Sequence, residues 1–384
     1  MTYGSAMRTK ICELFGIEFP ILAFTHCRDV VAAVTKAGGY GVLGAAGHTP
    51  EQLDIDLKWI AEEVADRSFG VDIIVPARYE GKDQGELAIK TLKDMIPAAH
   101  RAFLDDLLNR YDIPALPEED RSQPRAGEAT APMSYAQAVP LMDVAFSHPI
   151  SLIVNALGPP PPDMIERAHS QGVKVGALAG KKSHAVRHVA AGVDVIIAQG
   201  HEAGGHTGDI ATMVLVPEIV DAVTPVPVLA AGGIGSGRQM AAALALGADG
   251  VWCGSVWLTT LEAETHPTVK AKFLAASSSD TLRSRSRTGK PARQLRSAWT
   301  DEWEGPGSPG TLGMPLQPML IAEASRRIDR AAMNPANEGA VKLANYFVGQ
   351  IVGSMNESKH ADRVVLEMVD EFIDAVERVN EMMQ

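Results

Sequence analysis

The chain has 384 residues, 46% of them hydrophobic, so it is long enough to bury a large core. Acidic residues outnumber basic ones by 47 to 35, and the resulting net charge of −12 disfavours nucleic acid as the main partner. The sequence shows no run of about 18 apolar residues and no signal-peptide core. Three scattered cysteines (Cys12, Cys27 and Cys253) without CxxC spacing favour a reducing compartment. We therefore expect a cytoplasmic protein that does not bind membranes or nucleic acid.

The first 76 residues alternate between buried apolar runs and amphipathic stretches. Predicted strands occupy residues 19–24, 41–47 and 69–76. A helix is predicted over 30–36, with Asp29 as its N-cap, and another from Pro50 to about residue 65, with Thr49 as its cap. Such short β/α units indicate a parallel sheet covered by helices.

This alternation stops at residue 77 and resumes near residue 148. Residues 88–111 carry apolar side chains near helical spacing and predict one helix. Residues 114–132 are rich in proline and charge and predict an exposed loop. We interpret residues 77–148 as a helical insertion after the third strand.

Beyond residue 148 the β/α alternation returns five more times. The predicted strands are 149–158, 174–180, 195–198, 226–230 and 250–253, and the predicted helices that separate them are 159–172, 182–191, 214–223 and 238–246. Eight strands favour an α/β fold of the (β/α)8 TIM-barrel type over an open sheet. We predict a barrel domain over 1–265 that includes the insertion, and a C-terminal helical and loop extension over 266–384 that packs on it.

The expected extension has an irregular pattern. It contains a basic, turn-prone segment at 280–297 and a Gly/Pro loop at 305–318, followed by predicted helices at 319–333 and 361–383. We expect it to lie beside the barrel mouth or to serve a contact in a homo-oligomer.

The motif GGIGSG stands at 232–237, after a predicted strand and before a helix that starts near Arg238. Glycines let the backbone approach a phosphate closely, and a helix amino end supplies N–H donors and a partial positive charge. A dinucleotide fingerprint would need an acidic residue at the end of the next strand, which here ends in Cys253, Gly254 and Ser255. A phosphate held by the loops after strands seven and eight fits a barrel. Glycines that serve only a tight turn are the alternative.

A second motif, QGHEAGGHTG, stands at 199–208. Gln199 ends the sixth strand, where its amide can bond a polar ring edge. Gly204 and Gly205 let the backbone lie flat against a planar ligand. His206 would then point into the mouth, and an imidazole that titrates near neutrality suits a proton abstractor.

Two other interpretations of this motif compete with a catalytic base. His201, Glu202 and His206 could ligate a metal, but the two glycines between them disfavour a helical ligand geometry, and no other ligands cluster nearby. His206 could also be purely structural. We predict no metal.

Together these motifs resemble a known family. AQGHEAGGHTG, LVPEIVDAV, PVLAAGGIGSGR and AALALGADGVWCGS are similar to the central motifs of the nitronate monooxygenase (formerly 2-nitropropane dioxygenase) family of FMN-dependent TIM barrels. The segments ELFGIEFPIL, AVTKAGGYGVLGA and FGVDI resemble its first three strands, and GQIVG at 349–353 resembles its C-terminal signature. The resemblance covers most of the chain except the insertion and parts of the tail.

The resemblance implies roles for individual residues. Gln199 and Gly204 would contact the flavin, and His206 would face the isoalloxazine as the catalytic base or its assistant. The phosphate end would lie against Gly233 and the run WCGS. The expected FMN-binding residues are Asp72, Gln199, Gly204, Gly205, Gly232, Gly233, Trp252, Cys253, Gly254 and Ser255.

At two places the chain departs from the family pattern. Asp72 stands where the family has asparagine, so an amide donor is lost and a negative charge is added near the flavin. Phe24, Thr25, His26 and Cys27 stand where the family commonly has proline and methionine. His26 and Cys27 therefore either line an altered substrate pocket or supply an extra acid/base, or they form a loop pair that packs against the tail.

The activity implied by the resemblance is oxidation of alkyl nitronates with O2 to a carbonyl compound and nitrite. One alternative is an FMN-dependent reductase that uses NAD(P)H on enoyl thioesters or quinones, in which the basic segment at 283–296 would meet a nucleotide or acyl-CoA phosphate. The second alternative is a non-catalytic barrel that binds a flavin or a phosphate ligand. The presence of His206 argues against this alternative. In each enzymatic case the substrate is a small molecule, with O2 or NAD(P)H as co-substrate.

Overall fold

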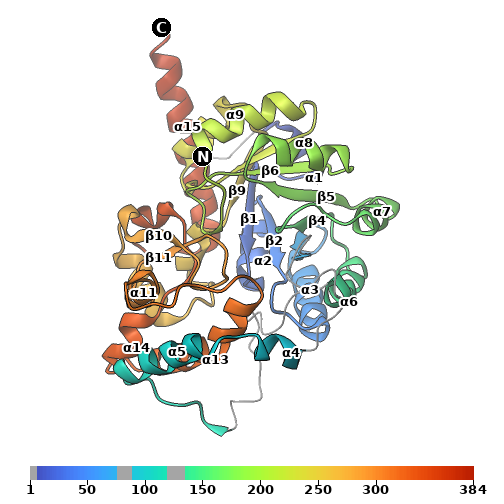
Figure 1. Cartoon of the computed structure of the whole chain (residues 1–384). Helices are drawn as coiled ribbons and strands as arrows, with labels where there is room; N and C mark the ends of the chain where they lie inside the picture. The colour runs from blue at the N-terminus through green and yellow to red at the C-terminus, as the bar shows by residue number, and fades with distance from the viewer. Residues whose placement is uncertain (1–6, 76–88, 119–134) are drawn as a thin grey trace.

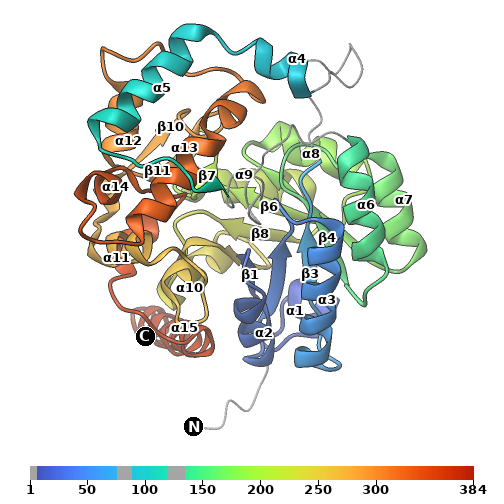
Figure 2. The same ribbon diagram turned by 90° about the horizontal axis from the view of Figure 1, so that it is seen from below.

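The protein is built around a closed barrel of eight parallel strands (Figures 1 and 2). The computed structural model describes residues 7–75, 89–118 and 135–384. The strands close in the order β1-β2-β3-β4-β5-β6-β8-β9, with β9 paired to β1. The barrel strands are β1 (Ile21–Thr25), β2 (Tyr40–Gly44), β3 (Gly70–Asp72), β4 (Leu152–Asn155), β5 (Lys174–Ala179), β6 (Val195–Gln199), β8 (Val228–Ala231) and β9 (Gly250–Cys253). The predicted TIM barrel is confirmed.

Eight helices form the outer layer of the barrel, and the last of them comes from the C-terminus. Helix α15 (Ala361–Glu381) packs against α10 and α2 and so closes the ring after β9. Its far end projects beyond the rest of the molecule in Figure 1. The other seven are α2 (Arg28–Lys36), α3 (Pro50–Val64), α6 (Tyr135–Phe146), α7 (Pro162–Ser170), α8 (Lys182–Ala190), α9 (Thr212–Val223) and α10 (Gly237–Ala245). The predicted extension thus includes the eighth barrel helix, and the region of the predicted insertion includes α6, which packs on α3.

Side chains of α1 fill the interior of the barrel at its amino end. The candidate site lies at the opposite, carboxyl end. Helix α1 (Lys10–Phe15), which was not predicted, places Ile11 and Phe15 in one buried cluster with the interior residues Leu22 and Tyr40. Strand side chains alternate between faces, so Leu22 belongs to the interior cluster and its neighbour Ile21 to the layer under the helices. The same alternation decides which site residues face inward.

A second hydrophobic core lies beside the barrel and joins two regions far apart in sequence. Residues from α4 and α5, such as Leu107, cluster with residues 269–355, such as Trp299 and Leu320. The guanidinium of Arg110 also bonds the Glu302 carboxylate at 2.7 and 2.8 Å. The helices here are α4 (Ile89–Asp94), α5 (Ala98–Arg110), α11 (Pro267–Ala275), α12 (Ala298–Glu304), α13 (Leu316–Ala332) and α14 (Glu338–Leu343), with short 3₁₀ turns η3 (Ser255–Thr259), η4 (Ser278–Asp280) and η5 (Gln350–Ser354).

The sequence predicts a basic, turn-prone segment at 280–297. The structure instead shows a hairpin of two strands there. β10 (Thr281–Ser284) pairs with β11 (Ala292–Leu295), and β11 pairs with the two-residue strand β7 (Gly205–His206). The third strand, β7, stabilises this ribbon and belongs to the loop after β6. The local sequence of the hairpin does not indicate that β7 is its partner. The hairpin thereby lies directly against His206.

Three other local predictions need correction. Cys27, not Asp29, is the N-cap of α2, and Asp29 lies in its first turn. The predicted helix 88–111 is two helices, because Pro97 stands as the N-cap of α5. The predicted strand 69–76 is only three residues long. Residues 77–88 and 119–134 of the predicted insertion lie outside the described residues. In the part of the chain that the structure describes, no helix combines the length and apolar character needed to cross a membrane.

Candidate active site

The carboxyl end of the barrel gathers the inward-facing residues of several strands. Trp252 is a buried member of the interior cluster, and its ring stacks on Phe24 at a centroid distance of 5.9 Å. His26 follows Phe24 by two positions, contacts its ring edge at 5.2 Å, and bonds the Gly44 carbonyl through Nδ1 at 2.8 Å. By the same alternation Gln199 ends β6 on the inner face. The structure therefore brings Gln199, Trp252 and His26 to one mouth.

Two of the predicted site residues turn their side chains away from this mouth. Cys27 belongs to the buried layer under the helices, and its thiol donates to the Glu262 carbonyl at 3.1 Å. Cys253 lies in the same layer, where burial raises the pKa of its thiol to about 12. Both positions follow from strand alternation, because their neighbours His26 and Trp252 take the inner face. Cys27 therefore does not line the pocket predicted for it, and Cys253 can offer a ligand only its backbone.

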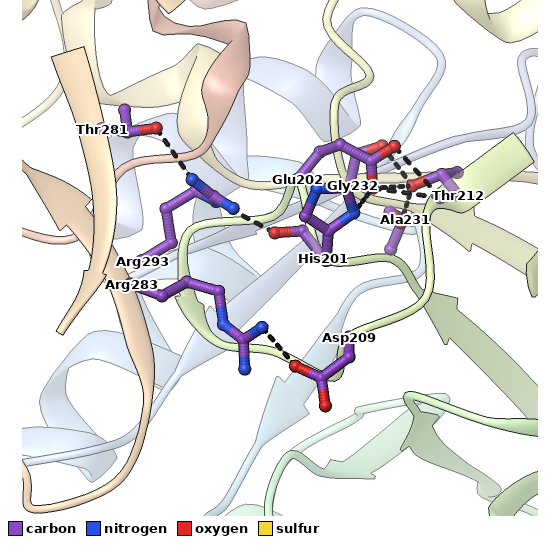
Figure 3. A network of polar contacts seen from close by, with 9 residues as sticks. All are labelled: His201, Glu202, Asp209, Thr212, Ala231, Gly232, Thr281, Arg283 and Arg293. Carbon is purple, nitrogen blue, oxygen red and sulfur yellow. Dashed lines mark hydrogen bonds and ion pairs between the residues drawn. The ribbon is translucent and has the colours of Figure 1, made fainter. Parts of the chain in front are cut away.

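The loop after β6 is held by the carboxylate of Glu202, shown in Figure 3. Its oxygens accept hydrogen bonds from the Thr212 backbone N–H at 3.0 and 3.1 Å and from the Thr212 hydroxyl at 2.9 Å. Thr212 Oγ1 also lies 2.9 Å from the Gly232 carbonyl. A carboxylate at the first turn of α9 is electrostatically favourable. Glu202 thus ties the loops after β6 and β8 together.

Two arginines of the hairpin attach it to the same loop (Figure 3). The buried Arg293 donates from Nε to the His201 carbonyl at 2.9 Å and from Nη1 to the Thr281 hydroxyl at 3.0 Å. Arg283 pairs with Asp209. These cations serve the structure of the loop that carries His206.

His206 is half-buried and is oriented by the hairpin turn. Its Nε2 lies 2.8 Å from the hydroxyl oxygen of Thr288, and that hydroxyl lies 3.2 Å from the Lys290 carbonyl. Among the described residues nothing bonds Nδ1, and Nδ1 is not buried from solvent. Burial first, and the positive charge of Lys290 second, lower the pKa of the imidazole to about 4. His206 is therefore neutral at neutral pH, with one free nitrogen.

The metal alternative is not supported by this arrangement. The Glu202 carboxylate is engaged by Thr212, and His206 Nε2 is engaged by Thr288. In the parts of the chain that the structure describes, these residues form no cluster of converging ligand atoms with His201.

The loops after β6, β8 and β9 converge, as the sequence predicts. A Cβ built on Gly204 would lie 2.9 Å from the backbone nitrogen of Gly349, and the N–H of Gly349 donates to the Ser255 hydroxyl at 2.8 Å. Gly233 approaches Glu202, so that a Cβ built on Gly233 would lie 3.3 Å from the Glu202 Cβ. GQIVG at 349–353 therefore joins the site through its first glycine.

Only the first half of the motif GGIGSG suits a phosphate. The backbone N–H groups of Gly233 (φ +71°) and Ile234 have no acceptor among the described residues. Two free donors in a glycine turn fit an anion such as the flavin phosphate. The α10 amino end is different, because the Glu371 carboxylate accepts from the Gly237 N–H at 2.9 Å and places a negative charge there. The helix terminus expected to help bind the phosphate is thus already occupied.

The motif's second half faces a cavity outside the barrel. Gly235 and Ser236 line a space of about 650 Å³ between α10, α15 and residues 354–359. The cavity also contains Glu367 and Glu371. Arg238 and Lys359 also line it, but Lys359 is paired with Glu367 and the carboxylates outnumber the cations, so the cavity is not a cationic phosphate site.

Asp72 ends β3 on the inner face and is 3% exposed. Burial raises the pKa of its carboxyl group to about 8, and a backbone hydrogen bond at Ala156 opposes this shift only in part. The group is therefore largely protonated at neutral pH and retains an O–H donor. At neutral pH, protonation therefore removes most of the negative charge that the sequence suggests at this position.

Sequence reasoning missed three residues of the site. Glu202 was considered only as a metal ligand, and Thr288 and Lys290 were part of a segment predicted as a turn-prone basic run. The signal for the last two was present, since TLRS and ARQL flank a Gly-Lys-Pro turn in the pattern of a hairpin.

Comparisons with known proteins agree with this geometry. The model of the family described as nitronate monooxygenase matches residues 8–371. A Mycobacterium tuberculosis protein, provisionally named a monooxygenase, is 60% identical over 98% of this chain and 100% of its own length. A Staphylococcus aureus protein, provisionally named a nitronate monooxygenase, is 26% identical over 89% of this chain and 91% of its own.

Solved structures show the same architecture over nearly the whole chain. A nitroalkane oxidase from Streptomyces ansochromogenes has a TM-score of 0.75 and 26% identity, with 96% of this chain and 99% of that one covered. FabK from Thermotoga maritima has a TM-score of 0.69 and 26% identity, with 98% and 99% covered. These similarities support an oxidoreductase that depends on a flavin. The match over residues 8–371, together with the barrel and its converging loops, shows that this chain belongs to the nitronate monooxygenase family.

Proposed function

We propose that the protein is an FMN-dependent nitronate monooxygenase, which oxidises alkyl nitronates with O2 to a carbonyl compound and nitrite. The observation that carries this proposal is the state of His206. It is neutral, half-buried, and held at Nε2 by Thr288, while Nδ1 is free among the described residues. Such a group can accept a proton from the acidic carbon of a nitroalkane and deliver the nitronate to the same site.

The hydrogen-bond pattern at Thr288 supports Nδ1 as the basic atom. Its hydroxyl donates to the Lys290 carbonyl, which leaves Oγ1 as an acceptor for the Nε2–H of His206. The imidazole is thereby assigned the tautomer whose lone pair is on Nδ1. A fixed tautomer and ring orientation are what a general base requires.

The residues around His206 fit FMN. The open space at Gly205, where a Cβ would meet nothing within 4 Å, suits a flat ring, and the Gly233 and Ile234 donors suit a phosphate. Gln199 and the protonated Asp72 carboxyl are polar groups for the ring edge. The bound flavin would supply the electron transfer and the reaction with O2, while the protein orients the substrate and moves its proton.

A reductase that uses NAD(P)H is the second candidate, favoured by the similarity to FabK. Anaerobic flavin absorption separates the two. We expect ethyl nitronate to bleach the flavin of the purified enzyme within a turnover, and NADH and NADPH to leave it oxidised. Bleaching by a nicotinamide alone would make the protein a reductase, and no bleaching by any of the three would favour a barrel without this chemistry.

A further inference from the structure

The turn of the β10–β11 hairpin carries a positive charge near His206, on Lys290, that has no partner among the described residues. Ala292 of β11 pairs with His206 of β7, and Lys290 precedes Ala292 by two residues. Both the N–H and the carbonyl of Lys290 contact the Thr288 hydroxyl that bonds His206. The side chain of Lys290 is only half-buried, yet its charge is one of the two causes that lower the pKa of His206.

The other half-buried and buried cations of the hairpin differ from Lys290 because each has a partner. Arg283 pairs with Asp209, and Arg293 bonds the His201 carbonyl. Arg287 bonds the Asn345 side chain at 2.7 and 2.9 Å. In the described part of the chain Lys290 makes no side-chain hydrogen bond or ion pair, and the same is true of Arg285, which is exposed. Lys290 is thus an ammonium without a partner among the described residues, on the turn that positions His206.

A cation in this position makes His206 a poorer base unless an anion lies between them. A bound anion would pair with this ammonium in a charge-assisted hydrogen bond. The anion would also stabilise the imidazolium that forms when Nδ1 accepts a proton. The positive charge of Lys290 near His206 therefore favours a ligand that carries a negative charge next to its reacting atom.

We propose that Lys290 is a substrate-binding residue that holds the two nitro oxygens of a nitronate, with the reacting carbon toward Nδ1 of His206. The inference rests on the proposed function. When a nitroalkane binds instead, its α-carbon proton passes to Nδ1, the C–H electron pair becomes the C=N bond, and the negative charge moves onto the oxygens next to Lys290. The site then favours small anions over neutral substrates.

The test compares Lys290→Met with the control Lys58→Met, which removes an exposed lysine from α3 outside the mouth. Flavin content and thermal unfolding establish that both variants are folded. We expect the KM for ethyl nitronate to rise at least tenfold in Lys290→Met with a smaller change in kcat, and to be unchanged in Lys58→Met. Lys290→Arg should recover part of the loss, because it restores the charge.

A second measurement is independent of turnover. Titration of the oxidised enzyme with nitrate, an unreactive planar oxyanion, should perturb the flavin absorption with a Kd at least tenfold weaker in Lys290→Met than in the wild type. Equal nitrate and nitronate affinities in the two proteins would overturn the role of Lys290, even if the wild type oxidises nitronates. If ethyl nitronate fails to reduce the wild type, the proposed function fails, and the nitrate titration still decides whether Lys290 binds anions. If the wild type binds no nitrate, the anion site is also rejected.

Discussion

His206→Asn is expected to lower turnover of neutral nitroethane by two to four orders of magnitude while the flavin stays bound. Asparagine keeps a polar side chain of similar reach but cannot accept the substrate proton, and a positioned general base contributes about 10²–10⁴-fold to such a reaction. The preformed anion ethyl nitronate needs no deprotonation, so its oxidation should fall much less. The ratio of the two rates separates loss of a base from general damage to the site.

The low pKa of His206 gives this prediction a pH dependence. Because burial lowers the pKa to about 4, the basic form dominates above that value. For the wild type, kcat/KM for nitroethane should therefore show no acid limb from His206 between pH 6 and 8, and should decline only as the pH approaches 4. His169→Asn is the control, because His169 is exposed in the last turn of α7, at the opposite end of the barrel. Unchanged nitroethane turnover in His206→Asn would remove His206 from the mechanism.

Asp72→Asn is expected to remove a pH-dependent loss of stability. In the folded protein the pKa of Asp72 is raised to about 8, so between about pH 4 and pH 8 the native state holds a proton that the unfolded state has released. Raising the pH across this range therefore destabilises the wild type, by about 1.4 kcal/mol per pH unit from this group and roughly 5 kcal/mol in total. An amide does not titrate, so the variant should escape this loss.

Urea unfolding at pH 5 and pH 7, with excess FMN, provides the comparison. Relative to the wild type, Asp72→Asn should gain roughly 2–3 kcal/mol between the two pH values. Asp66→Asn, which alters an exposed carboxylate, should follow the wild type. If the wild type and Asp72→Asn show parallel pH dependence, Asp72 is ionised at neutral pH and cannot donate to the flavin.

The sequence predicts the barrel well because each strand is a short apolar run bounded by glycine or polar residues. Strand alternation, applied to β1 and β9, also separates the inward His26 and Trp252 from the outward Cys27 and Cys253 once the bounds are known. The place of α15 was not predictable, since about a hundred residues separate it from β9 and its amphipathic pattern does not say which surface it covers.

The parts of the site that sequence reasoning missed depend on tertiary contacts. Lys290 and Thr288 acquire their roles only because β11 pairs with β7, about 85 residues earlier in the chain. Glu371, which accepts a hydrogen bond from the first N–H of α10, comes from the C-terminal helix. A glycine motif before a helix therefore predicts a phosphate site, but the sequence could not show which of the N–H groups of the motif are already bonded.

We expect one flavin mononucleotide to lie between the loops after β6, β8 and β9, and a crystal structure of the flavin-loaded enzyme would locate it. We expect the phosphate to accept from the N–H groups of Gly233 and Ile234, and the isoalloxazine to face His206. A phosphate in the outer cavity beside Ser236, or a ring that leaves His206 out of contact, would contradict the account.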